Sequence, residues 1–158
     1  HQPEMALKER QALAGRKHTK SIQFLDDNSQ PASQLLEIAD QLLLGEIAMA
    51  KGDADGSVMN FAKAVELQDQ LPYTEPPFWY YSTRQSLGYA LLAAKRDAEA
   101  EAVYAEDLQH YPRNGWSMYG LMQSLEAQGK QAEASEARKK LSTIWAQADI
   151  PLTASRLH

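Results

Sequence analysis

The sequence predicts an all-α protein. Of its 158 residues, 24 are Ala and 19 are Leu, against only 5 Ile and 3 Val. Ala and Leu lose little conformational freedom in a helix, whereas β-branched residues favour strands. The chain also lacks the Val- and Ile-rich runs that buried parallel strands need. Its length suits a single domain, residues 1–158.

A pattern of repeated helical hairpins organises most of the chain. A Leu-Gly pair in one helix leaves room for close packing, and a small residue followed by an aromatic meets that gap from the returning helix. The third copy keeps this pattern only in part. We expect the following residues to pack the hairpins: Leu44, Gly45, Ser57, Phe61, Leu87, Gly88, Ala100, Tyr104, Leu121 and Ala134.

The helix limits follow from capping residues and from the turns between hairpins. Ser33 is a candidate N-cap for the first hairpin. Thr74 is the candidate N-cap for the second, with Pro76 and Pro77 in the first helical turn. The third hairpin is expected to cap the array. The expected elements are one N-terminal helix over 4–24, hairpins over 33–71, 76–111 and 114–145, and a short helix or extended tail over 149–158.

The second hairpin resembles the tetratricopeptide repeat. The residues that carry this resemblance are Leu87 and Gly88 in one helix, Ala100 and Tyr104 in the next, and Pro112 beyond it. Arg84 and Leu91 stand where the family pattern has Trp and Tyr. The resemblance implies a right-handed superhelix of about three repeats, whose first helices line a concave peptide-binding groove. The resemblance to the repeat covers about residues 33–145. The loop over 71–77, the run Trp79-Tyr80-Tyr81 and the run Asn114-Gly115-Trp116 also look like the C-terminal region of longer bacterial proteins of this family, and this similarity implies no particular activity.

Several aromatic and polar residues fall on the first helices of the second and third hairpins. Tyr and Trp suit recognition surfaces because a rigid side chain offers apolar area and a polar tip. The register of the repeat directs some of these residues towards the groove, and core packing is the alternative for the aromatic ones. The predicted groove residues are Tyr89, Tyr119, Gln123, Arg84 and Trp116.

The residues that usually carry catalysis or bind metals are sparse. The chain has no Cys, so disulfides, thiol catalysis and Cys-ligated zinc are excluded. Its four histidines, His1, His18, His110 and His158, have no partner at metal-binding spacing. No glycine-rich phosphate loop occurs. The sequence therefore predicts no cofactor, no metal and no enzymatic activity.

Charge and hydropathy narrow the range of partners. A net charge of −5 disfavours a general nucleic-acid surface. However, the first 20 residues carry five Lys or Arg against two Glu. No apolar run is long enough to span a membrane.

The absence of Cys is compatible with both the cytoplasm and the periplasm. Of these two compartments, we expect the cytoplasm.

These observations favour a non-catalytic scaffold that binds a protein or peptide partner. Its terminal helices could also be exchanged between two copies of the chain. A second hypothesis is a regulatory or recruiting module of a longer enzyme or secretion component, because the chain begins at His1 as a processed or truncated product would. A third hypothesis is RNA binding through the basic N-terminal helix.

Overall fold

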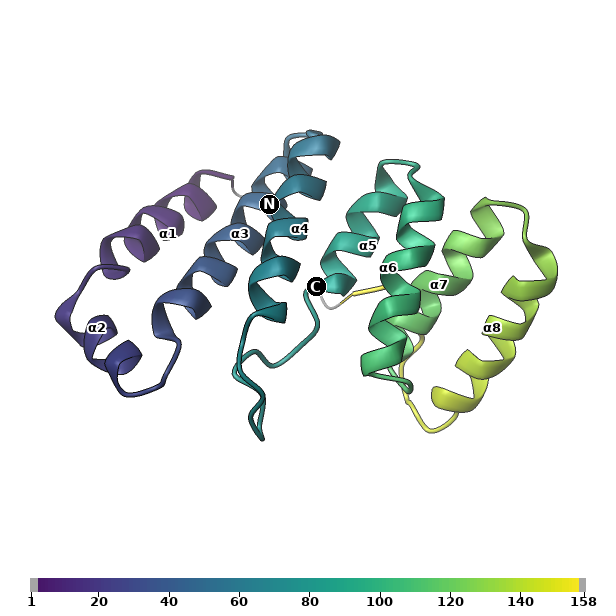
Figure 1. Ribbon diagram of the computed structural model, residues 1–158. Helices are drawn as coiled ribbons and strands as arrows, with labels where there is room; N and C mark the ends of the chain where they lie inside the picture. The colour runs from purple at the N-terminus through teal and green to yellow at the C-terminus, as the bar shows by residue number, and fades with distance from the viewer. Residues whose placement is uncertain (1–2, 157–158) are drawn as a thin grey trace. The chain divides into compact units, whose positions relative to one another are not determined.

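The computed structural model describes residues 3–156 and is all-helical, as the composition predicts. Those residues form eight helices and no strand (Figure 1). None of these helices is long and apolar enough to cross a bilayer. The chain divides into two compact units, residues 1–83 and 84–158.

Unit 1 is built around one long helical hairpin. Its helices are α1 (Pro3–Arg16), α2 (Lys20–Asp27), α3 (Ala32–Ala50) and α4 (Ala54–Asp69). Helix α3 packs along α4, and α1 and α2 both pack on α3. The side chains of Ile38, Phe61 and Ala64 are fully buried between these helices. Burial of such apolar area is the main source of stability for the unit.

The single helix expected over residues 4–24 is wrong, because the chain forms α1 and α2 instead. The break lies at Thr19, whose backbone is extended. Both the amide and the hydroxyl of Thr19 donate to the carbonyl of Arg16, at 3.1 Å each. A hydroxyl that bonds a nearby carbonyl competes with the helical ladder and favours a turn.

Two of the expected helix caps are also wrong. Helix α3 begins after Pro31, and the amide of Ser33 donates to Oδ1 of Asp26, 3.0 Å away. The cap of α3 therefore comes from the end of α2 and not from a residue beside α3. Thr74 caps no helix, since its hydroxyl donates to the carbonyl of Pro76.

The second hairpin starts later than expected, because α5 begins at Arg84 and residues 76–83 form no helix. The amide side chain of Gln68 in α4 explains this difference. Its Oε1 accepts from the amide and the hydroxyl of Thr83, and its Nε2 donates to the carbonyl of Tyr81, all within 2.9 Å. Backbone groups that a helix would use internally are thus bonded to α4.

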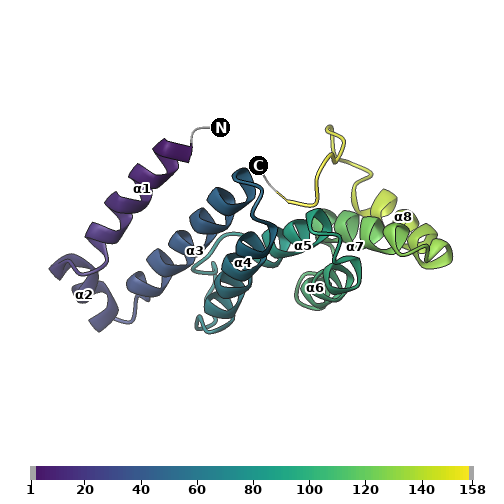
Figure 2. The ribbon, with the colours of Figure 1, turned by 90° about the horizontal axis from the view of Figure 1, so that it is seen from above.

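Unit 2 contains the remaining helices, α5 (Arg84–Ala93), α6 (Asp97–His110), α7 (Gly115–Ala127) and α8 (Gln131–Ile144). Helix α6 packs on both α5 and α7, α5 also contacts α7, and α8 packs on α7. In Figure 2, α6 lies on one side of α5 and α7, and the non-helical residues after α8 return along the other side.

Four helices end in the same hydrogen-bonded turn. The residue after the last helical turn has a positive φ: Ser29 after α2, Gly52 after α3, Lys95 after α5 and Gly129 after α7. The next amide then bonds a carbonyl five residues back, as Arg96 does to Leu91 at 2.9 Å. This is the arrangement in which glycine is favoured. Ser29 and Lys95 adopt this conformation although neither is a glycine.

Candidate functional site

The ring of Tyr104 passes between two helices of unit 2. Tyr104 belongs to α6 and is completely buried. A Cβ atom added to Gly88 of α5 or to Gly120 of α7 would collide with this ring. Both positions therefore need glycine, since only a missing side chain leaves room for the aromatic ring.

The hydroxyl of Tyr104 contacts Ser155, close to the end of the chain. It donates a 2.6 Å hydrogen bond to Oγ of Ser155, which is also completely buried. Burial raises the pKa of Tyr104, although the bond to Ser155 and the charge of Arg156 act in the opposite direction. The hydroxyl therefore stays protonated at neutral pH and remains a hydrogen-bond donor.

Arg156 lies on the aromatic face of Tyr89. Its guanidinium carbon is 4.6 Å from the ring centroid, a cation–π distance. Arg156 is only 9% exposed. Residues 150–156, here called the tail segment, run along the side of α5 and α7 that faces away from α6 (Figure 2). We call that side the α5–α7 face.

Trp145 directs the chain back towards α7. Its ring lies where a side chain on Gly115 would be, and its centroid is 5.2 Å from that of Trp116 in an edge-on arrangement. Its indole nitrogen donates to the carbonyl of Ile150, 2.8 Å away. The end of α8 and the start of α7 thus fix the point from which the tail segment leaves.

The residues predicted to line the groove lie in different surroundings. The ring of Tyr89 contacts the guanidinium group of Arg156. Arg84 is buried, and its Nη2 is 2.8 Å from Oε1 of Glu106 in α6. Trp116 packs against Trp145. Of these three residues, Tyr89 contacts the tail segment through Arg156.

The other two predicted groove residues lie one turn apart on α7. Tyr119 is half-buried and packs against the apolar core that α7 and α8 share. Gln123 is half-buried four residues later, on the same side of the helix.

The residues of the packing signature are distributed over both units. In unit 1, a Cβ on Gly45 would collide with Phe61, and the buried Ser57 donates its hydroxyl to the carbonyl of Ala54. Leu44 beside them is half-buried.

In unit 2, the matching contact joins Gly88 to Tyr104. Leu87 and Ala100 are buried beside it, and Ala134 is buried in the α7–α8 core, with Leu121 packed against that core. The third hairpin has Arg138 at the aromatic position, and this side chain pairs with Glu126.

Sequence reasoning missed three residues of the α5–α7 face: Gly120, Ser155 and Arg156. One signal was present for Gly120, since a glycine inside a helix is unfavourable and indicates close approach by another group. Ser155 and Arg156 carry no local signal, because their partners are far away in the sequence.

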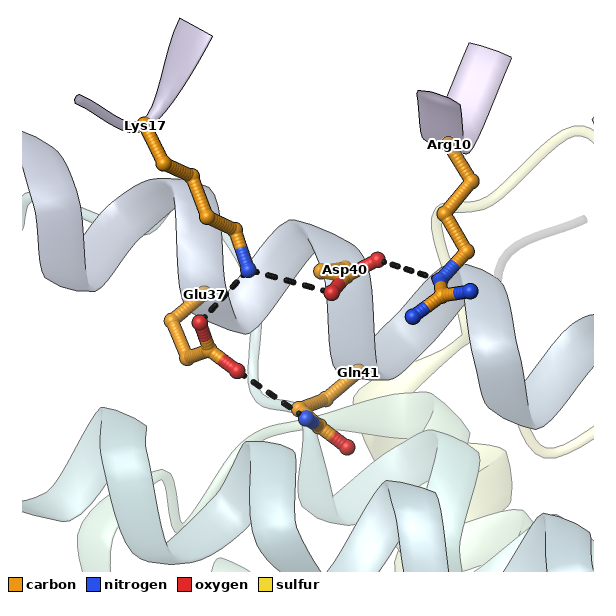
Figure 3. Close-up of polar contacts among 5 residues, drawn as sticks. All are labelled: Arg10, Lys17, Glu37, Asp40 and Gln41. Atoms are coloured by element: carbon orange, nitrogen blue, oxygen red, sulfur yellow. Dashed lines mark hydrogen bonds and ion pairs between the residues drawn. The ribbon is translucent and has the colours of Figure 1, made fainter. Parts of the chain in front are cut away.

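A separate polar network joins α1, and Lys17 directly after it, to α3 in unit 1 (Figure 3). Nζ of Lys17 lies 2.6 Å from Glu37 and 3.0 Å from Asp40, and Nε of Arg10 lies 2.8 Å from Asp40. Gln41 donates to the second oxygen of Glu37 at 3.1 Å. Two of the basic residues near the N-terminus are therefore neutralised by carboxylates of the same unit.

The pKa values of this network reflect the same contacts. Burial alone would lower the pKa of Lys17, but hydrogen bonds to Glu37 and Asp40, with their negative charges, raise it above its ordinary value. The hydrogen bond from Lys17 is the main reason that the pKa of Glu37 is lowered. The pair is therefore charged across the neutral range.

Unit 2 also has an open hollow of about 540 Å³ between α6, α7 and α8. Its lining combines the apolar side chains of Met118, Leu121 and Leu125 with charged ones such as Glu133 and Lys140. Apolar and polar groups together are typical of a protein-binding surface. This hollow is the second candidate surface of the unit.

No protein-family model, curated protein or solved structure matches the chain. The resemblance to the tetratricopeptide repeat thus rests on the sequence pattern alone. Among residues 3–156, no group of three or more His, Asp or Glu side chains could hold a metal ion. Of the four histidines considered above, His1 and His158 lie outside the described residues.

Proposed function

We propose that the chain is a non-catalytic interaction module that binds an extended segment of a partner protein on the α5–α7 face. The observation that supports this is the tail segment, which lies on that face and contacts it through Ser155 and Arg156. A face that holds one non-helical segment through an aromatic ring and a buried hydroxyl offers the same contacts to another segment.

The resemblance to the tetratricopeptide repeat supports the same proposal. Members of that family bind peptides on the first helices of their repeats, and α5 and α7 hold this position in the second and third hairpins. The glycine–aromatic contacts Gly45–Phe61 and Gly88–Tyr104 fall at equivalent places in the first two hairpins. We therefore include a superhelix of the tetratricopeptide type in the proposal.

The alternative functions have less support. A recruiting module of a longer enzyme or secretion component would use the same face, so it differs only in what the module is attached to. RNA binding through the basic N-terminus is less favoured, because Arg10 and Lys17 already pair with Asp40 and Glu37. Basic side chains neutralised within the protein contribute little to phosphate binding.

Site-specific photocrosslinking in the native cell tests the proposal. A benzoylphenylalanine replaces Tyr89 in one variant and Tyr111 in the matched control, which is an exposed tyrosine at the end of α6. We expect an adduct with a discrete segment of another polypeptide at position 89 and none at position 111. Equal yields at both positions, or no adduct at position 89, would contradict a binding role for this face.

A further inference from the structure

The tail segment offers the α5–α7 face two side chains that differ in chemistry. Ser155 provides an oxygen that accepts from the Tyr104 hydroxyl, and Arg156 provides a planar cation that lies on Tyr89. Of the side chains from 150 to 156, only these two are buried, while Pro151 and Thr153 are exposed. Ser155 and Arg156 therefore make the buried side-chain contacts of the tail segment with the α5–α7 face.

Each position of the face selects a class of side chain. An aromatic ring face attracts cations, and arginine in particular because its planar guanidinium stacks on the ring. The Tyr104 hydroxyl is a buried donor, so an occupant without an acceptor would leave it unsatisfied at a substantial free-energy cost. A hydroxyl-bearing residue followed by arginine meets both requirements.

We propose that the α5–α7 face is an arginine-binding surface. The tail segment occupies it within the chain, and an extended partner segment in which a hydroxyl-bearing residue precedes an arginine takes its place. This inference rests on the proposed function and adds the class of partner to it. The helices of unit 2 pack directly on one another, so the tail segment can leave while they stay folded.

The test uses a fluorescein-labelled peptide of residues 149–158 and the full-length chain. In the wild-type chain the tail segment competes with the peptide, because only the fraction with an open face can bind. The double variant S155A/R156A weakens this competitor. We expect the peptide to bind the double variant at least about 10-fold more tightly than the wild-type chain, as measured by fluorescence anisotropy.

Two controls define the specificity of this gain. Arg113→Ala removes an exposed arginine elsewhere in unit 2 and should bind the peptide as the wild-type chain does. Adding Tyr89→Ala to the double variant should remove the gain, whereas adding Tyr89→Phe should retain most of it, because the ring face is kept. A peptide with alanine in place of Arg156 should not bind.

Three results would overturn the inference: no gain in the double variant, equal binding of the arginine-free peptide, or a gain that survives Tyr89→Ala. Far-UV circular dichroism establishes that each variant is folded. If the double variant is unfolded, the milder Arg156→Lys replaces it in the binding test. Lysine keeps the charge but loses the planar group, so this variant should bind the peptide several-fold more tightly than the wild-type chain.

The two proposals can fail separately. A crosslinked partner at position 89 without binding of the peptide would leave the proposed function standing and reject the arginine-binding surface. Binding of the peptide with no crosslinked partner would give the opposite result.

Discussion

The Tyr104 hydroxyl donates its hydrogen bond to Ser155, a residue 51 positions further along the chain. The ring of Tyr104 comes from α6, and it reaches the tail segment only because Gly88 and Gly120 leave space for it between α5 and α7. One side chain therefore serves both the packing of these helices and the attachment of the tail segment. Changes at Tyr104 should separate the two roles.

Tyr104→Phe keeps the ring and removes only the hydroxyl. The buried oxygen of Ser155 then loses its donor, which should cost about 1 kcal/mol. We expect faster amide hydrogen exchange in residues 152–156, with the exchange of α5 and α7 almost unchanged. The matched control is Tyr111→Phe, at an exposed tyrosine. Uniformly faster exchange over unit 2 would mean that the hydroxyl supports the helices and not the tail segment.

Gly120→Ala tests the close approach of α7 to Tyr104. The added Cβ collides with a buried ring, and overpacking of this kind destabilises by about 1–3 kcal/mol. Urea denaturation should show a lower midpoint. In the control Gly15→Ala, the new methyl group meets nothing within 4 Å in α1, so helix propensity should make it neutral or slightly stabilising. Equal midpoints for the two variants would refute the close contact.

The fold class was predictable because it depends on local preferences. An excess of Ala and Leu over β-branched residues favours helices throughout a chain. The contacts of Gly45 with Phe61 and of Gly88 with Tyr104 follow the same repeated spacing. The helix expected from residue 76 was wrong because a distant side chain, Gln68, bonds the backbone of that segment. Helix propensity contains no information about such a partner.

The α5–α7 face was predictable only in part. Tyr89 was selected because the repeat register directs it outward, and the structure places Arg156 on it. Trp116 is predicted from the aromatic cluster on the first helices of the second and third hairpins, and Trp145 from the end of α8 packs against it. The sequence does not predict that the tail segment lies on this face. Ser155 and Arg156 have the composition of a solvent-exposed segment, and their partners Tyr104 and Tyr89 are far away in the sequence.

Lys95→Gly should stabilise unit 2. Lys95 has a φ of 61° at the end of α5, where α3 and α7 have Gly52 and Gly129. A left-handed conformation costs a residue with a side chain about 1–2 kcal/mol, and the greater freedom of glycine in the unfolded state offsets part of this gain. We expect a net increase of about 0.5–1 kcal/mol in the free energy of unfolding. The reciprocal change Gly129→Ala should destabilise by a similar amount, and a loss of stability in Lys95→Gly would contradict the argument.

The strength of the ion pair between Lys17 and Glu37 should depend on pH. The pKa of Glu37 is lowered from 4.5, so its contribution is present above that value and is lost as the pH falls through the lowered pKa. The pKa of Lys17 is raised from 10.5, so its contribution is present below that value and is lost as the pH rises through the raised pKa. The contact should therefore be strongest between about pH 5 and 10.

Lys17→Met measures this contact. At pH 7 we expect faster hydrogen exchange in α1 and a loss of about 1 kcal/mol, which is modest because Glu37 is partly exposed. The loss should shrink at pH 3.5. The control Lys63→Met removes an exposed pair with Glu66 and should change stability by less than about 0.5 kcal/mol at either pH. A loss in Lys17→Met that does not vary with pH would assign the effect to packing of the lysine chain.

Gln68→Leu should release the segment that precedes α5. The Gln68 side chain makes three hydrogen bonds to Tyr81 and Thr83, and leucine can make none of them. Because Thr83 is completely buried, its unsatisfied groups should destabilise the protein by about 1–3 kcal/mol. Hydrogen exchange should rise in residues 78–83 before it rises in α4. Gln70→Leu changes an exposed glutamine two residues away and should leave this segment protected. Equal exchange in the two variants would mean that the aromatic contacts among residues 79–81, and not Gln68, hold the segment.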